Sequence, residues 1–196
     1  MNIMTRFTPL FILALPACSD VEKDGHDDHH DHDHEVISTV VLNLTSQADG
    51  TEQEIRWVDG EGQDQDIILT NATAYDLSVS ALNELEDPIE DITPEIADEA
   101  DEHQLFFTGS AIDDEIITHT YEDSDSAGLP LGLENTVDAI AAGVGELTVT
   151  LRHLALQNGN KVKREGMAED VAAEGFSGIS GEGDNDFSVD LVIEVQ

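Results

Sequence analysis

The C-terminal residues of the chain alternate between apolar and polar side chains, and this pattern constrains the fold more than any other feature. In a β-strand successive side chains point to opposite faces, so alternation predicts a strand that is buried on one face only. Ser188, Asp190 and Glu194 share the polar face. The other face is apolar throughout: Phe187, Val189, Leu191, Ile193 and Val195. Such a strand needs partner strands and a second layer to cover its apolar face.

Similar stretches, rich in β-branched and aromatic residues, recur along the chain between turn signals. The segment Asp59-Gly60-Glu61-Gly62 predicts a tight turn that joins two of them into a hairpin. We expect strands at residues 36–44, 54–58, 66–70, 75–81, 103–108, 115–121 and 146–154. About eight short strands separated by turns favour a mostly β fold, an antiparallel immunoglobulin-like β-sandwich over residues 36–196.

One or two short helices should interrupt the strands. Thr93-Pro94-Glu95 places a hydroxyl, a proline and an acid in the order typical of a helix start, and predicts a helix that ends near Ala100. A second helical piece is expected at residues 135–142. Residues 158–186 are polar and glycine-rich, which predicts a long loop or a hairpin.

The first 17 residues predict a signal peptide. Arg6 precedes a short apolar run, residues 11–15, which is too short to span a bilayer. The run ends in Leu15-Pro16-Ala17-Cys18, which resembles the lipobox of bacterial lipoproteins and implies that Cys18 is acylated. Ser19 then favours the outer membrane in Gram-negative sorting. The alternative is an ordinary signal peptide followed by a chance cysteine.

Residues 18–35 form a polar tether that is predicted to be disordered, because its His/Asp-rich part has no apolar residue to bury. Imidazole suits zinc and copper, and the aspartates add oxygen ligands. We therefore expect loose, exchangeable binding of divalent metal by His26, His29, His30, His32 and His34. The alternative is a solvated spacer without a metal role.

The charge balance restricts the partners of the chain. Its 44 acids face seven bases, which gives a formal net charge of −37. Phosphate binding needs cations, so nucleic acid is excluded as a partner. Anionic headgroups are also unfavourable, so the lipid on Cys18 would have to provide the membrane anchor. Cys18 is the single cysteine of the chain, so no intrachain disulfide can form.

The domain offers two further candidate metal sites. Three histidines lie on predicted strands, and a converging set of His103, His119 and His153 could hold zinc or copper; the preferred alternative is three separate structural histidines. The turn near residue 123 has partial calcium-loop spacing, with Asp123, Asp125 and Glu134 as ligands. Calcium is the less favoured ion there, because a polar hairpin turn explains the same residues.

No catalytic motif is recognisable. The chain has no G-x-S-x-G, no H-E-x-x-H and no phosphate-binding glycine loop. We therefore expect a protein that is not an enzyme.

Several segments together resemble an uncharacterised, β-rich family of small bacterial envelope lipoproteins. The matching segments are Leu82-Asn83-Glu84, residues 88–93, residues 99–107, residues 123–133 and the strand Thr148–His153. The resemblance implies an envelope location and, as a partner, an outer-membrane receptor for metal or nutrient uptake.

The sequence thus favours a lipid-anchored envelope protein that captures or buffers divalent metal through its His/Asp tract. Two alternatives remain. One is a structural or adhesion-type surface module in which the tract is only a stalk. The other is a carrier that binds a small ligand in the sandwich.

Overall fold

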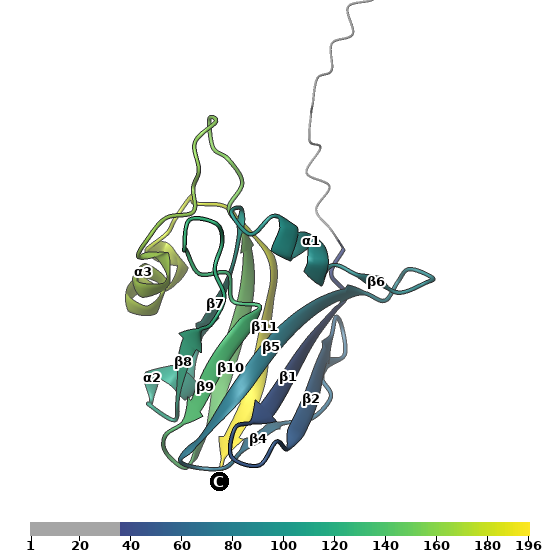
Figure 1. Cartoon of the computed structure of the whole chain (residues 1–196), viewed down its shortest axis with the longest axis vertical. Helices are drawn as coiled ribbons and strands as arrows, with labels where there is room; N and C mark the ends of the chain where they lie inside the picture. Colours follow the sequence, from purple (N-terminus) through teal and green to yellow (C-terminus); the bar gives the residue numbers. More distant parts are fainter. Residues whose placement is uncertain (1–35) are drawn as a thin grey trace, which may run out of the picture. The chain divides into compact units, whose positions relative to one another are not determined.

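The computed structural model describes residues 36–196, which belong to one compact unit. Two facing sheets form a β-sandwich, with short helices at its margins (Figure 1). The prediction of a mostly β, antiparallel sandwich is confirmed, although the described residues contain more strands than expected. Within these residues, no helix is both long and apolar enough to cross a membrane.

The larger sheet has seven strands in the order β3-β2-β1-β5-β9-β8, with β6 paired to β5, and all its pairings are antiparallel. At its centre β1 lies between β2 and β5, and at one edge β8 pairs only with β9. The strands are β1 Thr39–Ser46, β2 Glu52–Val58, β3 Gly62–Gln63, β5 Thr73–Asn83, β6 Glu90–Asp91, β8 Ile117–Tyr121 and β9 Glu134–Ala139.

The smaller sheet has four strands in the order β4-β11-β10-β7. They are β4 Ile67–Leu69, β7 His103–Thr108, β10 Gly143–His153 and β11 Asp184–Val195. The pairing of β4 with β11 is parallel, and the other pairings are antiparallel. The expected hairpin between residues 54–58 and 66–70 is wrong: β2 pairs with the short β3, and β4 crosses to the other sheet.

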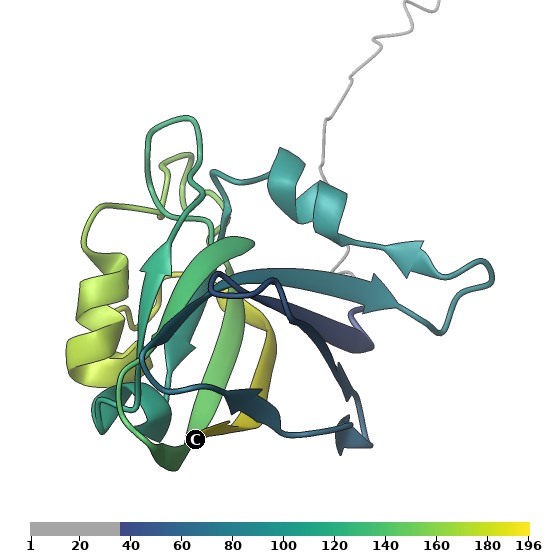
Figure 2. The same ribbon diagram turned by 60° about the horizontal axis from the view of Figure 1, so that its bottom comes forward.

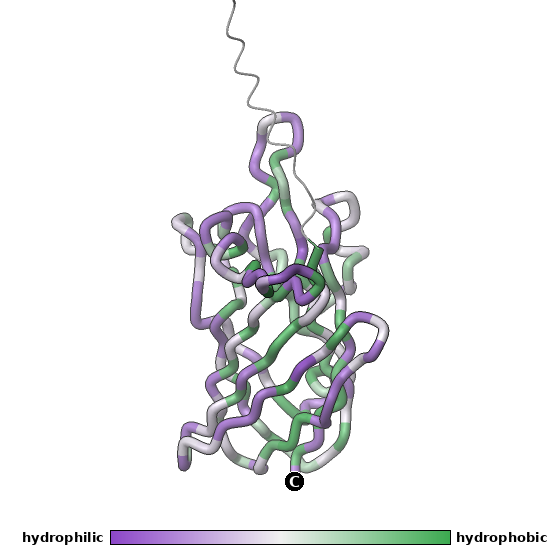
Figure 3. The backbone as a smooth tube through the Cα atoms, turned by 90° about the vertical axis from the view of Figure 1, so that its right-hand side faces the viewer, coloured by the Kyte–Doolittle hydropathy of each residue, from purple (hydrophilic) through white to green (hydrophobic). Residues whose placement is uncertain are grey.

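The core lies between the sheets and follows the alternation of the sequence. Along β11 the side chains of one face are at most 9% exposed: Phe187, Val189, Leu191, Ile193 and Val195. On the other face Ser188, Asp190 and Val192 are exposed to solvent. Figure 3 shows the same alternation of hydrophobic and hydrophilic residues along the strands. Residues 36–196 contain a core of their own, so we expect this unit to fold alone.

Short helices cover the margins of the sandwich: α1 Thr93–Asp98, α2 Ser110–Asp113, α3 Met167–Glu174 and the 3-10 turn Gly175–Ser177. The predicted helix at Thr93 is present, but Ile92 is its N-cap residue and the Thr93 hydroxyl contacts the Ala81 backbone instead. Helix α3 packs on the outer face of the smaller sheet, where Met167 and Val171 contact Phe106 of β7 (Figure 2).

Two further local predictions are wrong. Residues 135–142, expected to be helical, form most of β9, because pairing with both β5 and β8 overrides local helix propensity. Residues 158–186, expected to be a loop, contain α3, whose buried Met167 and Val171 provide a short apolar stripe.

Candidate functional site

Two histidines meet at one end of the smaller sheet. β10 is antiparallel to both of its neighbours, so the end of β10 lies beside the start of β7 and the start of β11. In this register His153, the last residue of β10, pairs directly with His103, the first residue of β7. The imidazole rings stack with centroids 4.7 Å apart and planes inclined by 22°.

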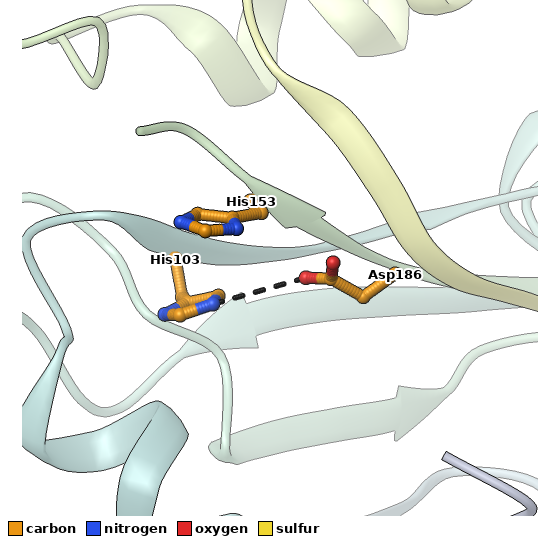
Figure 4. A group of neighbouring side chains, drawn as sticks. All are labelled: His103, His153 and Asp186. Atoms are coloured by element: carbon orange, nitrogen blue, oxygen red, sulfur yellow. Dashed lines mark ion pairs between the residues drawn. The ribbon is translucent and has the colours of Figure 1, made fainter. Parts of the chain in front are cut away.

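A β-bulge in β11 adds a carboxylate to this pair. Phe187 lies opposite Leu151 and Asn185 lies opposite Arg152, so Asp186 is the extra residue between them. Bulges change the direction of a side chain within an otherwise regular strand. Here Asp186 Oδ2 lies 3.8 Å from His103 Nε2 (Figure 4).

The resulting cluster is His103, His153 and Asp186, whose candidate ligand atoms all lie within 4.8 Å of one another. A second carboxylate lies nearby, since Glu102 Oε2 is 3.6 Å from His153 Nε2. The three side chains of the cluster are between 9% and 12% exposed, and that of Glu102 is 22% exposed. The cluster is therefore largely desolvated.

The hydrogen bond of His103 determines its tautomer. His103 Nδ1 lies 3.2 Å from the Glu99 carbonyl oxygen, and only an N–H can donate to a carbonyl. Burial, together with the neighbouring His153, lowers the pKa of His103 to about 4. The ring is therefore neutral at pH 7, and its Nε2 lone pair faces Asp186.

Two imidazoles and one or two carboxylates form a ligand set that suits zinc and copper. Ligands of a tetrahedral zinc ion lie about 3.4 Å apart, given Zn–N and Zn–O distances of about 2.0–2.2 Å. The contact between His103 and Asp186 is already close to this spacing. Because metal–nitrogen bonds lie in the ring plane, the stacked rings would have to tilt apart to direct both nitrogens at one ion.

The structure does not bring the third candidate histidine to this cluster. His119 lies on β8 in the other sheet, where its Nε2 is 2.8 Å from Asn135 Oδ1 and its ring stacks on Phe107. Burial lowers the pKa of His119 as well. Sequence reasoning grouped His103, His119 and His153 as one possible site and preferred three separate structural histidines, whereas the structure brings together His103 and His153 only. It missed Asp186, which falls in the loop or hairpin predicted for residues 158–186.

The candidate calcium residues hold a loop together instead of converging on one point. Asp123 accepts hydrogen bonds from the backbone N–H groups of Gly132, Leu133 and Glu134. Asp125 accepts two more, from residues 127 and 129, and pairs with Lys163. Glu134 is exposed on β9. This geometry fits the polar turn, which was the preferred interpretation.

The other predicted site residues lie outside the described residues: Cys18, the signal peptide before it, and His26, His29, His30, His32 and His34 of the tether. Their predicted roles stay predictions.

Comparison with known proteins adds no functional information. No protein-family model matches the chain, and no curated protein or solved structure matches it.

Proposed function

We propose that this chain binds a divalent transition metal, zinc or copper, at the cluster of His103, His153 and Asp186. The observation that carries the proposal is the approach of His103 Nε2 to Asp186 Oδ2 at 3.8 Å. Because His103 donates through Nδ1, its Nε2 is an acceptor, and so is the carboxylate. Two acceptors facing each other in a desolvated site are stabilised by a cation between them.

The environment of His103 favours a metal ion over a proton between His103 Nε2 and the Asp186 carboxylate. Burial keeps His103 neutral down to about pH 4, so a proton does not bind there near pH 7. Metal ligands must be unprotonated, and a neutral histidine whose other nitrogen donates to a carbonyl is a common arrangement around bound metals. Glu102 supplies a second carboxylate beside the cluster and thus a fourth candidate ligand.

The sequence extends this proposal beyond the sandwich. In the extended proposal, Cys18 carries the lipid that anchors the protein to the cell envelope, at the outer membrane. The His/Asp tract captures metal loosely, the cluster in the sandwich holds one ion more tightly, and an outer-membrane uptake receptor is the partner. Labelling cells with radioactive palmitate tests the anchor, since Cys18→Ala should remove the label and release the protein from membranes.

Calorimetric titration with zinc at pH 7 tests the metal site. We compare the chain from Ser19, which lacks the lipid, with the chain from Val36, which also lacks the tract. The longer chain should show several weak sites and one tighter site, and the shorter chain should keep only the tighter one. Absence of zinc binding to the shorter chain would overturn the cluster as a site, and absence from both would overturn the metal function.

Matched variants locate the site. His103→Gln in the shorter chain should abolish the tighter site. His119→Gln is the control, because His119 is also a histidine on a strand and is partly buried, but it lies outside the cluster. Equal zinc affinity in these two variants would contradict the proposal.

A further inference from the structure

A pocket of about 790 Å³ lies on the side of the sandwich where both sheets end, at edge strands β7 and β8. All five residues of β8, from Ile117 to Tyr121, line this pocket. The loop at residues 127–130 and helix α3 form other walls, and Figure 1 and Figure 2 show α3 beside these strands. The pocket is therefore a groove that follows β8 along its length.

The edge of β8 that faces away from β9 presents backbone hydrogen-bonding groups. In an antiparallel pair, alternate residues exchange both backbone hydrogen bonds with the partner strand, and the residues between them direct theirs to the opposite side. Glu122 N–H donates to the Glu134 carbonyl, so in this register the even-numbered residues bond to β9. The N–H and C=O groups of His119 and Tyr121 therefore point away from β9. Within residues 36–196 these backbone groups make no hydrogen bond.

The neighbouring edge strand, β7, is already covered in part. The N–H of Leu105, in the middle of β7, donates to the Leu131 carbonyl. The Leu105 carbonyl accepts the hydroxyl of Tyr121. The hydrogen-bonding edge that is open to a partner in this groove therefore belongs mainly to β8.

The composition of β8 does not discourage pairing with a further strand. Edge strands usually carry lysine, proline or a bulge that blocks such pairing. The exposed side chains of β8 are those of Thr118 and Thr120, and its register with β9 is regular throughout. Threonine also favours the strand conformation.

The walls that face this edge are largely apolar. The loop contributes Leu129 and Pro130, α3 contributes Ala168 and Ala172, and α2 contributes Ile112. All five residues are at least partly accessible to solvent. Every second side chain of an added strand would point to the same side, so the side chains that face these walls should be apolar.

The charges around the groove favour a cationic partner. The guanidinium of Arg164, which lies in the lining, is already paired with Asp170 and Glu182. Three exposed acids also line the groove: Glu115, Glu165 and Glu169. A second copy of this chain, with its formal net charge of −37, would be repelled, whereas lysine and arginine side chains would be attracted.

We propose that β8 accepts an extended segment of a basic partner protein as an added strand, held by backbone hydrogen bonds to His119 and Tyr121. Apolar side chains of the segment face the groove, and its lysine or arginine residues meet the acids. In this mode of recognition the main chain provides affinity and the groove provides specificity. The proposal goes beyond metal binding and does not depend on it, since none of the three cluster residues lines the groove.

Fluorescence anisotropy with the chain from Ser19 tests this proposal. The probe is a rhodamine-labelled peptide, Lys-Val-Thr-Val-Thr-Val-Lys, which should bind. Two further peptides carry N-methyl groups on the valines or on the threonines. One of these two should bind about tenfold more weakly than the other, because only one set of N–H groups faces β8. No binding of the probe, or equal affinities of the two methylated peptides, would overturn the proposal.

Hydrogen exchange measured by NMR places the peptide on the strand. Saturating peptide should slow the exchange of the His119 and Tyr121 amides by about tenfold or more. Unchanged exchange at both amides would overturn the pairing with β8. Protection of these amides in concentrated protein without peptide would identify a second copy of the chain as the occupant, and would also overturn the proposal.

Matched variants test the charges of the groove. Glu165→Gln/Glu169→Gln should weaken binding of the lysine peptide several-fold. Glu52→Gln/Glu54→Gln is the control, because it removes the same charge from exposed positions on β2, in a distant part of the same sheet. Equal weakening in the two double variants would contradict a role for the acids of the groove.

A bulky substitution tests the groove itself. Ala168→Trp, on the wall formed by α3, should fill the groove and abolish peptide binding. Circular dichroism checks that this variant is folded. Peptide binding that persists in the folded variant would show that the peptide lies elsewhere.

Discussion

His103 and His153 are directly paired residues of β7 and β10, and their rings stack with centroids 4.7 Å apart. Charge on one ring disfavours charge on the other, and His153 contributes to the low pKa of His103. His103 is therefore poorly suited to holding a proton. It is better suited to sharing one ion with the Asp186 carboxylate.

The metal-free protein should lose stability in acid through His103. Its pKa is about 4 when folded, against about 6.5 in an unfolded chain, so between these values the unfolded state binds more protons. The free energy of unfolding is highest above about pH 6.5 and falls as the pH approaches 4, by up to about 3 kcal/mol from this residue. Urea unfolding in EDTA across this range measures the effect.

Carboxylates with lowered pKa values, including Asp125 and Glu84, also destabilise the protein in acid. The contribution of His103 is therefore the difference between the wild type and His103→Gln. That difference should shrink by up to about 3 kcal/mol from pH 7 to pH 4. Two pH profiles that run parallel would disprove the assignment.

Zinc should stabilise the folded sandwich. When the free zinc concentration is about 100 times Kd, one bound ion adds about 2.7 kcal/mol to the free energy of unfolding. Asp186→Asn keeps the side-chain volume but removes a charged ligand, so it should weaken binding by about tenfold or more. The melting temperature with and without zinc, measured in the chain from Val36, reports both effects. If zinc raises the melting temperature of Asp186→Asn as much as that of the wild type, Asp186 is not a ligand.

The buried ion pair of Lys163 and Asp125 should be important for stability. Lys163 Nζ lies 3.2 Å from Asp125 Oδ2 and donates to the Ala100 carbonyl at 2.7 Å. Both side chains are at most 2% exposed, and burial lowers the pKa of Lys163. Lys163→Met leaves the carboxylate buried without its partner and should lower the free energy of unfolding by about 3–5 kcal/mol.

The double variant Lys163→Met/Asp125→Asn should recover much of this loss in urea unfolding. Asparagine removes the charge but keeps the oxygen that accepts the N–H groups of Ala127 and Leu129. If the double variant is less stable than Lys163→Met alone, charge burial is not the reason for the loss.

The approach of α2 to β10 requires glycine at position 145. A Cβ there would lie 2.7 Å from Ala111 Cα and 2.8 Å from Ala111 N, which are backbone atoms that cannot move independently. Gly145→Ala should therefore destabilise the protein by about 1–3 kcal/mol in thermal unfolding. On the same strand, Gly143→Ala is the control, because its Cβ would meet only the flexible end of Ile116. Equal losses of thermal stability in the two variants would argue against a close contact between α2 and β10 at Gly145.

Local patterns in the sequence were sufficient for the secondary structure wherever one face of a strand is buried. The alternation in the last strand predicted its buried face correctly, since all five residues of that face, from Phe187 to Val195 in alternate positions, lie in the core. The same reasoning failed at residues 135–142, where strand pairing on both sides overrides helix propensity. It predicted the strand β4 correctly but gave it the wrong partner, because no local signal shows that a strand crosses to the other sheet.

The candidate site likewise depends partly on the sequence and partly on tertiary contacts. The sequence by itself determined which residue types were available: histidines on strands, an acidic surface and a His/Asp tract before the domain. Only the tertiary structure decided that His103 and His153 meet, because their pairing depends on the register of β7 against β10. Asp186 joins them only because of the bulge in β11. Both depend on contacts between residues that are far apart in the chain, and a pattern of neighbouring residues does not encode such contacts.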